Sequence, residues 1–485
     1  MPTEITIQSI LASALPKELD IDIIESKKHE IILKSIGIDY KKFENNGIGF
    51  DYEKMMAESG YSFDQIRNIQ NDSMVGDTPL IELKNLSNFS RKFAEKGKGA
   101  RIFLKDEAAN LSGSFKARRA SVSVLKAKEM GYKGVIAATS GNYGAAVAAM
   151  AAKHNLKCII VQECFDSNGV GQPEILEKAR ACEAYGAEVL QLSVGPELFY
   201  VFLELLDKTG FFNASLYSPY GIMGIETLGY EIAKDIFKRE NKYPDVVIAT
   251  NAGGGNLTGT ARGLKRAGAK NTLVYGASVD LTGLHMASDK DFNKKSFTTG
   301  HTGFGIPFAT NPDRSDVPRS AARPLRYIDD YYTVNQGSVF YITELLALTE
   351  GMERGPAGNT SLAVAFKLAQ NLDRDQIIVV QETEYTGAGK HPNAQLSFAK
   401  NNGVKILFGK PKNEIPGENI IFPKSARDLS IKKLNLMKLK KSYLKKYAEV
   451  KLTKLDYEFL SQELRLNIEL IQELIEEVKN ERKSR

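Results

Sequence analysis

A lysine that follows a short turn-forming segment is the first candidate for covalent chemistry in this sequence. Ser112, Gly113 and Ser114 favour a turn, and the residues after Phe115 are typical of a helix, so we expect Lys116 near a helix N-terminus. The partial positive charge at that end disfavours an ammonium group and helps to keep the amine nucleophilic. This motif alone does not separate Lys116 from a surface lysine, because the chain holds 65 lysine and arginine residues.

A second turn, at residues 139–144, follows a predicted strand and opens an alanine-rich predicted helix. The amide side chain of Asn142 could donate a hydrogen bond to a ring oxygen there, and free N–H groups at the helix start could bind a carboxylate. The alternative is that Ser140 or Asn142 simply caps the helix.

A glycine-rich loop lies between a predicted strand at residues 246–249 and a predicted helix at 261–267. Consecutive glycines let backbone N–H groups converge, and the helix start adds a favourable potential for a phosphate. The loop is not a dinucleotide fingerprint, because its third glycine position holds Thr258. A tight turn is the alternative to a phosphate cup. The residues of the predicted cup are Gly253, Gly254, Gly255, Asn256 and Leu257.

A last motif follows the predicted strand at residues 376–380. Gly389 and Lys390 are spaced as in a nucleotide-binding P-loop, but Glu384 occupies the earlier glycine position and His391 the serine or threonine position. The sequence therefore excludes that motif here.

Short apolar segments alternate with amphipathic helices between these motifs, which predicts an α/β protein with parallel sheets. Two sheets are expected, with functional sites at the carboxyl ends of the strands, in the cleft between them. The predicted strands are residues 81–83, 101–104, 134–138, 157–162, 188–192, 246–249, 273–277 and 376–380.

The pattern divides the chain into four parts. Residues 1–74 are predicted to be a helical extension, with helices at 3–15 and 26–36. Residues 75–215 and 216–410 are predicted to be two α/β domains, the first with Lys116 and the second with the glycine loop. Residues 411–485 are predicted to be a lysine-rich helical tail with one amphipathic helix at 456–479, which either packs by its apolar stripe or docks a partner.

Composition excludes several classes of protein. The 485 residues, 42% of them hydrophobic, suffice for two domains with cores of their own. A net charge of +6 does not indicate the basic face of a nucleic-acid-binding protein. Three cysteines are too few for a disulfide framework and fit the cytoplasm. Neither a membrane span nor a secretion signal is expected.

In this order, the motifs resemble those of the fold-type II pyridoxal-phosphate enzymes, the group of threonine synthase, tryptophan synthase β and cysteine synthase. The resemblance covers about residues 76–391. It implies two α/β domains with pyridoxal 5'-phosphate in the cleft, a Schiff base with Lys116, a contact from Asn142 to the ring hydroxyl, and a phosphate held by residues 253–257. It also implies that Thr386, or alternatively Thr383, faces the pyridine nitrogen.

Longer stretches are similar to the β subunits of 2-amino-4-oxopentanoate thiolases, acyltransferases of ornithine fermentation in anaerobic bacteria. This resemblance implies that coenzyme A cleaves the substrate to acetyl-CoA and alanine, reported for the family as the D-isomer. Lys116 would then also take the Cα proton. The expected partners are a small α subunit, coenzyme A and the amino acid, in an oligomer without nucleic acid or membrane. The similar stretches are residues 50–56, 160–164, 195–200, 296–304, 351–359 and 379–391.

Two other functions stay open. One is a lyase or a β- or γ-replacement enzyme of the threonine synthase or diaminopropionate ammonia-lyase type, which would act alone and without coenzyme A. The other is a non-catalytic assembly partner that binds the cofactor, and the joint presence of Lys116, Asn142 and the glycine loop argues against it.

The remaining candidate residues have structural alternatives. A loop at residues 301–305 and a run of arginines are unusual for a simple α/β body. Arginines suit a carboxylate or the phosphates of coenzyme A, but ion pairs are the alternative. Cys164 follows a predicted strand, and we expect it to be a buried structural thiol. No metal site is predicted. The arginines are Arg314, Arg319, Arg323 and Arg326.

Overall fold

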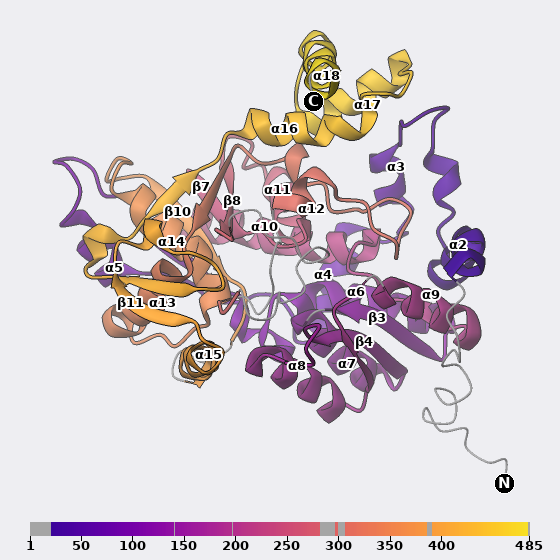
Figure 1. Cartoon of the computed structure of the whole chain (residues 1–485), viewed down its shortest axis with the longest axis horizontal. Coiled ribbons are helices and arrows are strands. Elements are labelled where there is room, and N and C mark those ends of the chain that lie inside the picture. Colours follow the sequence, from indigo (N-terminus) through magenta and orange to yellow (C-terminus); the bar gives the residue numbers. More distant parts are fainter. Residues whose placement is uncertain are drawn as a thin grey trace.

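Two mainly parallel sheets, of four and seven strands, form the body of the protein, and helices lie on their faces (Figure 1). The computed structural model describes residues 21–139, 141–195, 197–281, 296–298, 306–385 and 390–483, with the backbone only for 390–392 and 483. The predicted helix at 3–15 therefore lies outside the described residues. The predicted helix at 26–36 is found within α2 (Ile21–Ile36).

The four-stranded sheet has the order β5-β4-β3-β6, and all of its strands are parallel. The alanine-rich helix α7 (Asn142–His154) packs against β3 and β4, because its small side chains allow a close approach to the sheet. Helix α6 (Lys116–Glu129) packs against α7. The strands are β3 (Gly134–Thr139), β4 (Lys157–Phe165), β5 (Glu188–Ser193) and β6 (Phe212–Asn213).

The seven-stranded sheet has the order β1-β2-β10-β7-β8-β9-β13. Its inner strands are parallel, as predicted, and the two edge strands β1 and β13 pair antiparallel with their neighbours. A parallel pair of strands needs a crossover connection, usually a helix, whereas an edge strand can pair antiparallel without one. The strands are β1 (Leu80–Glu82), β2 (Arg101–Asp106), β7 (Val246–Thr250), β8 (Leu273–Val279), β9 (Asp330–Val334), β10 (Ile377–Glu382) and β13 (Ile431–Lys433).

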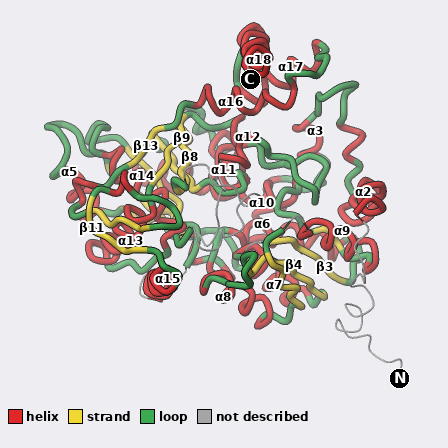
Figure 2. Tube along the Cα trace, viewed as in Figure 1, coloured by secondary structure: helices red, strands yellow, loops and turns green. Residues whose placement is uncertain are grey.

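All eight strands predicted from the sequence are present, which confirms the α/β class. The sheets do not follow the predicted division at residues 215 and 216, because β1 and β2 belong to the larger sheet. The domain boundaries themselves stay a prediction. Figure 2 shows helical segments around both groups of strands. The other helices of the body are α3 (Tyr52–Ala57), α4 (Phe63–Asp72), α5 (Lys84–Arg91), α8 (Pro173–Ala184), α9 (Glu197–Thr209), α12 (Ile306–Thr310), α13 (Gln336–Glu350), α14 (Pro356–Ala369) and α15 (Lys390–Asn401).

Helices α10 (Pro219–Glu240) and α11 (Gly255–Arg266) pack closely against each other. A Cβ atom on Gly263 would lie 1.9 Å from the carbonyl oxygen of Glu226, and one on Gly229 would lie 2.0 Å from that of Thr260. Glycine is therefore required on both sides of this contact. The packing also explains why α11 starts six residues before the predicted 261, in a stretch of weak helix formers.

The C-terminal part is not wholly helical. Strands β11 (Lys405–Gly409) and β12 (Asn419–Pro423) form a parallel pair, and β13 extends the large sheet. Three helices follow, α16 (Leu436–Leu444), α17 (Lys454–Leu464) and α18 (Ile468–Lys483), seen in yellow in Figure 1. The prediction of one helix at 456–479 is wrong, because Arg465 adopts a left-handed conformation that ends α17.

The apolar stripe of this region packs inward rather than standing free. Leu460 and Leu464 are buried, and Leu474 is nearly so. Among the described residues, the structure has no helix with the length and apolar character needed to cross a membrane.

Candidate active site

A cavity of about 150 Å³ brings together residues of all four motifs singled out in the sequence. Residues from the start of α6 and α7, from the loop before α11 and from the end of β10 line it. It therefore lies where the carboxyl ends of β3, β7 and β10 meet, as expected for a parallel α/β fold. The predicted site residues on its wall are Lys116, Asn142, Gly253, Gly254, Gly255, Asn256 and Thr383.

Lys116 is the first residue of α6, as the sequence predicts. Its Nζ lies 4.7 Å from the centre of the Phe115 ring, and the half-buried side chain lines the cavity. Burial, followed by the nearby charge of Arg119, lowers the pKa of Lys116 to about 7. An appreciable share of the amine is therefore neutral and nucleophilic near pH 7.

Asn142 is the first residue of α7 and lines the same cavity. It does not cap the helix, because the N-cap position is held by Gly141. The hydroxyl of Thr139 accepts hydrogen bonds from the N–H groups of Gly141 and Gly144, at 3.1 and 3.2 Å. The amide of Asn142 is thus placed on the cavity wall without a capping role.

The glycine loop forms a cup of unused donors. The first intrahelical hydrogen bond of α11 runs from the N–H of Thr258 to the carbonyl of Gly254, at 3.0 Å. The three preceding N–H groups, of residues 255–257, are therefore not used by the helix. Gly254 adopts a left-handed conformation with φ of 83°, which turns the chain into the helix. The side-chain Nδ2 of Asn256 is buried and has no hydrogen-bond partner among the described residues.

Leu257 belongs to this cup through its backbone only. Its side chain is fully buried in the core and does not line the cavity. Its N–H lies in the free first turn of α11, where helix ends bind anions.

Comparison with known proteins decides the family. The model of the family described as "Pyridoxal-phosphate dependent enzyme" matches residues 72–384. The chain belongs to this family. Its members use pyridoxal 5'-phosphate, and the observed groups fit that cofactor: a lysine amine with a lowered pKa for its aldehyde, and unused N–H donors at a helix start for its phosphate.

Individual relatives narrow the similarity. The 2-amino-4-ketopentanoate thiolase beta subunit of Acetoanaerobium sticklandii is 61% identical over 469 residues, which cover 96% of this chain and all of the relative. A threonine synthase of a Bacillus species is 28% identical and covers 61% of the chain and 77% of the relative. Among solved structures, a hydrogen sulfide-producing enzyme of Fusobacterium nucleatum shares the fold, with a TM-score of 0.51 at 24% identity, over 66% of this chain and 97% of the other.

Of the two threonines expected to face the pyridine nitrogen, the structure describes only Thr383. Thr386 lies outside the described residues. Thr383 lines the cavity, and its carbonyl accepts a hydrogen bond of 3.0 Å from the N–H of Phe115. This contact joins the end of β10 to the residue next to Lys116, so the two motifs hold each other in place. The choice between the two threonines stays a prediction.

Three charged residues on the cavity wall were not predicted from the sequence: Arg119, Glu174 and Lys178. Glu384, which belongs to the motif after the strand at 376–380, also lines the cavity. Burial raises the pKa of Glu174 and of Glu384. The charge of Glu384 raises the pKa of Glu174 further, and the nearby Lys178 opposes the rise in both carboxyls. The cavity therefore holds two carboxyl groups whose pKa values lie above the ordinary value, together with Lys116, whose pKa is lowered. Of the three residues that were missed, only Arg119 carried a signal in the sequence, since it lies three residues after Lys116 on the same helix face.

The lowered pKa of Lys116 predicts how the apoprotein takes up its cofactor. We expect the rate of pyridoxal-phosphate capture to rise with pH through a midpoint near 7, because only the neutral amine attacks the aldehyde. Stopped-flow absorbance over a pH series would measure it. A small alkylamine in solution is the control, and its rate should still climb near pH 10. The same high midpoint in the protein would contradict the lowered pKa.

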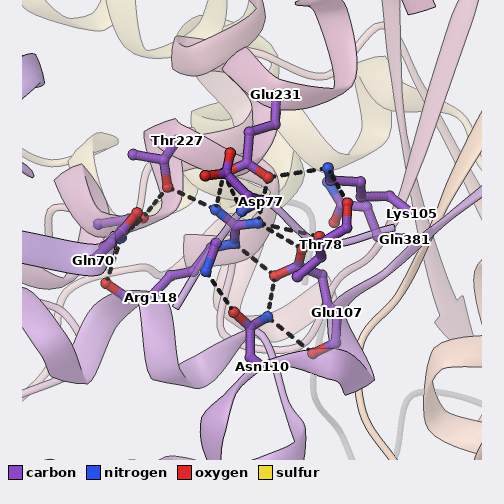
Figure 3. Close-up of polar contacts among 12 residues, drawn as sticks. Gln70, Asp77, Thr78, Lys105, Glu107, Asn110, Arg118, Thr227, Glu231 and Gln381 are labelled. Atoms are coloured by element: carbon purple, nitrogen blue, oxygen red, sulfur yellow. Dashed lines mark hydrogen bonds and ion pairs between the residues drawn. The ribbon is translucent and has the colours of Figure 1, made fainter. Parts of the chain in front are cut away.

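A buried ion network behind the site fixes helix α6 (Figure 3). The guanidinium of Arg118 lies between Glu107 and Glu231, with hydrogen bonds of 2.7 to 2.8 Å to both carboxylates. It also donates to the hydroxyl of Thr227, at 2.9 Å. Burial alone would raise the pKa of Glu231, but Arg118 and Lys105 outweigh it and lower that pKa to about 2. The residue two positions after Lys116 is thus anchored to α10 and to the segment that follows β2.

The remaining candidates have structural roles. Arg319 and Arg323 pair with Asp313, and Arg323 and Arg326 pair with the buried Glu463 of α17. These ion pairs tie the C-terminal helices to the body, which supports the structural alternative for the arginine run.

Cys164 adds no group to the cavity wall. Cys164 lies inside β4, packs against Ile175 and Ala179, and has a pKa that burial raises to about 12. It is a structural thiol, as expected. The loop at 301–305 lies outside the described residues.

Proposed function

We propose that this chain is the cofactor-bearing β subunit of a 2-amino-4-oxopentanoate thiolase, and that Lys116 is its Schiff-base residue. One observation carries the reaction: the similarity to the beta subunit from A. sticklandii extends along almost the whole chain, beyond the region shared with other members of the family. The name of that relative, 2-amino-4-ketopentanoate thiolase, denotes the same substrate. That relative is named a beta subunit, which supports an α subunit as the partner of this chain.

The proposed reaction balances with coenzyme A as the only co-substrate. The thiol of coenzyme A adds to the C4 carbonyl of 2-amino-4-oxopentanoate, the C3–C4 bond breaks, and acetyl-CoA leaves. C3 gains a proton, and alanine remains. Pyridoxal phosphate, when bound, supplies the electron-withdrawing ring that acidifies the Cα–H bond and stabilises negative charge toward C3.

The residues of the cavity divide the remaining tasks. Lys116, with its pKa of about 7, is proposed to take the Cα proton and to return it, in addition to holding the cofactor. Asn142 is proposed to contact the ring hydroxyl, residues 253–257 the phosphate, and Thr386 or Thr383 the pyridine nitrogen. Glu174, whose pKa burial raises and whose side chain lines the cavity, is proposed to supply the proton as C3 forms its new bond.

A cytoplasmic location and an oligomeric state belong to the same proposal. The three cysteines of the chain are buried, and none of them forms a disulfide, which suits a reducing compartment. The lyase or replacement type of activity, which the Bacillus threonine synthase represents, has only the shared fold core in its favour.

Purification with and without the candidate small subunit tests the reaction. We expect acetyl-CoA and alanine to form from 2-amino-4-oxopentanoate only when both subunits and coenzyme A are present. The same complex with Lys116→Ala serves as the control for the chemistry. Full activity of the single chain on a phosphohydroxy or diamino acid, without coenzyme A, would overturn the thiolase proposal in favour of the lyase or replacement type.

A further inference from the structure

Arg119 is a buried cation that lacks an acidic partner. It is only 1% exposed, and among the described residues its one hydrogen bond runs from Nη1 to the carbonyl oxygen of Leu216, at 3.2 Å. Its Nε has no partner in that part of the chain. The neighbouring Arg118 is equally buried, yet two carboxylates neutralise it. The two adjacent arginines therefore differ in their partners: Arg118 is paired within the protein, and Arg119 remains available for an anion.

The guanidinium of Arg119 lies against the glycine loop. A Cβ atom on Gly255 would fall 1.7 Å from its Nη2, so the arginine occupies the space that any side chain at position 255 would need. Both residues line the cavity. Arg119 thus reaches from α6 to the first residue of α11, where the helix dipole and the free N–H groups of residues 255–257 already favour an anion.

This arrangement is unfavourable unless an anion joins it. A buried charge without a partner costs free energy, and here it lies beside the positive end of a helix, which repels it. Burial lowers the pKa of Arg119 to about 10, which leaves it charged at neutral pH. The buried Nδ2 of Asn256 is a further donor without a partner among the described residues, on the same stretch of cavity wall.

We propose that Arg119 binds the phosphate of pyridoxal phosphate together with the loop at residues 253–257 and holds that phosphate as a dianion. Arg119 lies one helical turn after Lys116, so one face of α6 presents both the amine for the aldehyde and the guanidinium for the phosphate. The carboxylate of the amino-acid substrate is the other anion that enters the cavity. The free N–H groups at the start of α11 favour phosphate, since several donors converge there on one anion.

The test compares two cofactors that differ only in the phosphate. Apoprotein carrying Arg119→Gln is titrated with pyridoxal 5'-phosphate and with pyridoxal, and binding is followed by absorbance. We expect the ratio of the affinity for pyridoxal 5'-phosphate to that for pyridoxal to fall about 10- to 100-fold, the range for the loss of a charged hydrogen bond. The ratio is the readout because Arg119 also lowers the pKa of Lys116, an effect that acts on both aldehydes alike. Arg119→Lys should restore part of the loss, because it keeps the charge but not the fork of donors.

Two readouts separate this role from a structural one. Lys178→Gln is the matched control: it removes a charge from the same cavity on α8, beside Glu174 and Glu384 rather than the glycine loop, and should leave the ratio of the two affinities unchanged. Phosphorus NMR of the holoprotein should show a phosphate shift that is constant with pH in the native protein and titrates in Arg119→Gln. The apoprotein should unfold at an equal or higher temperature in the variant, since an unpaired charge is removed.

Three results would overturn the proposal. Equal weakening of both cofactors, with a less stable apoprotein, would assign Arg119 to the fold. Unchanged cofactor affinity with a raised KM for the amino acid would assign it to the substrate carboxylate. A phosphate that titrates in the native protein as it does in the variant would show that Arg119 does not hold the phosphate as a dianion. These measurements use no thiolase substrate except in the second case, so they can fail or succeed independently of the proposed reaction.

Discussion

Lys116→Ala should abolish the visible absorption of the bound cofactor and the turnover of the holoenzyme together. The substitution removes the only amine placed at the start of α6, where burial and Arg119 lower its pKa to about 7. Loss of a positioned proton-transfer group alone costs about 10²- to 10⁴-fold in rate. Loss of the covalent attachment adds to this, so we expect no turnover above background.

Lys178 supplies the matched control, because it is a second lysine on the same cavity wall. Lys178→Ala should keep the visible band, since the side chain lies on α8 near Glu174 and Glu384 and is not next to the Phe115 ring. A band that survives in Lys116→Ala but disappears in Lys178→Ala would move the attachment to α8. Partial recovery of turnover in Lys116→Ala by an added small primary amine would support a proton-transfer role beyond attachment.

The sequence was informative where chemistry depends on neighbours along the chain. Lys116, Asn142 and the glycine loop each follow or precede an element whose pattern is local, so their places at helix starts could be predicted. The loop was placed correctly although the helix after it begins earlier than predicted. Its early start depends on contacts between Gly263 and Glu226 on another helix, which no local pattern contains.

Contacts between residues that lie far apart along the chain could not be predicted from the sequence. Glu174 on α8 and Glu384 after β10 are 210 positions apart, and only the tertiary structure brings both to the cavity. Strand β13 was missed for a similar reason: it is three residues long and contains two lysines, so it is recognisable only by its pairing with β9. The apolar stripe is continuous in the sequence, but the helix ends at Arg465, which adopts a left-handed conformation. Arginine rarely adopts this conformation, so its residue type does not predict the turn.

Arg118→Met should cost about 3–5 kcal/mol of unfolding free energy, the range for breaking a buried ion pair by removing one partner. The methionine fills most of the space but leaves the buried Glu107 and Glu231 facing each other without the cation that now joins them (Figure 3). Urea unfolding of the apoprotein would measure the loss. Arg239→Met is the control, because Arg239 is 40% exposed and pairs with Glu82 at the surface, where about 1 kcal/mol or less is expected.

The pH dependence identifies the cause of that loss. In the native protein the pKa of Glu231 is about 2, below its ordinary value of 4.5, so its stabilisation is complete above about pH 4.5 and is lost as the pH falls toward 2. Without Arg118 the pKa of Glu231 should rise, and protonation should then relieve the unpaired charge. The gap in stability between native protein and Arg118→Met should therefore narrow on acidification. A gap that stays constant from pH 7 to about 3 would attribute the loss to packing instead. Since α6 carries both Lys116 and Arg119, a network that fails at Arg118 should also weaken cofactor binding.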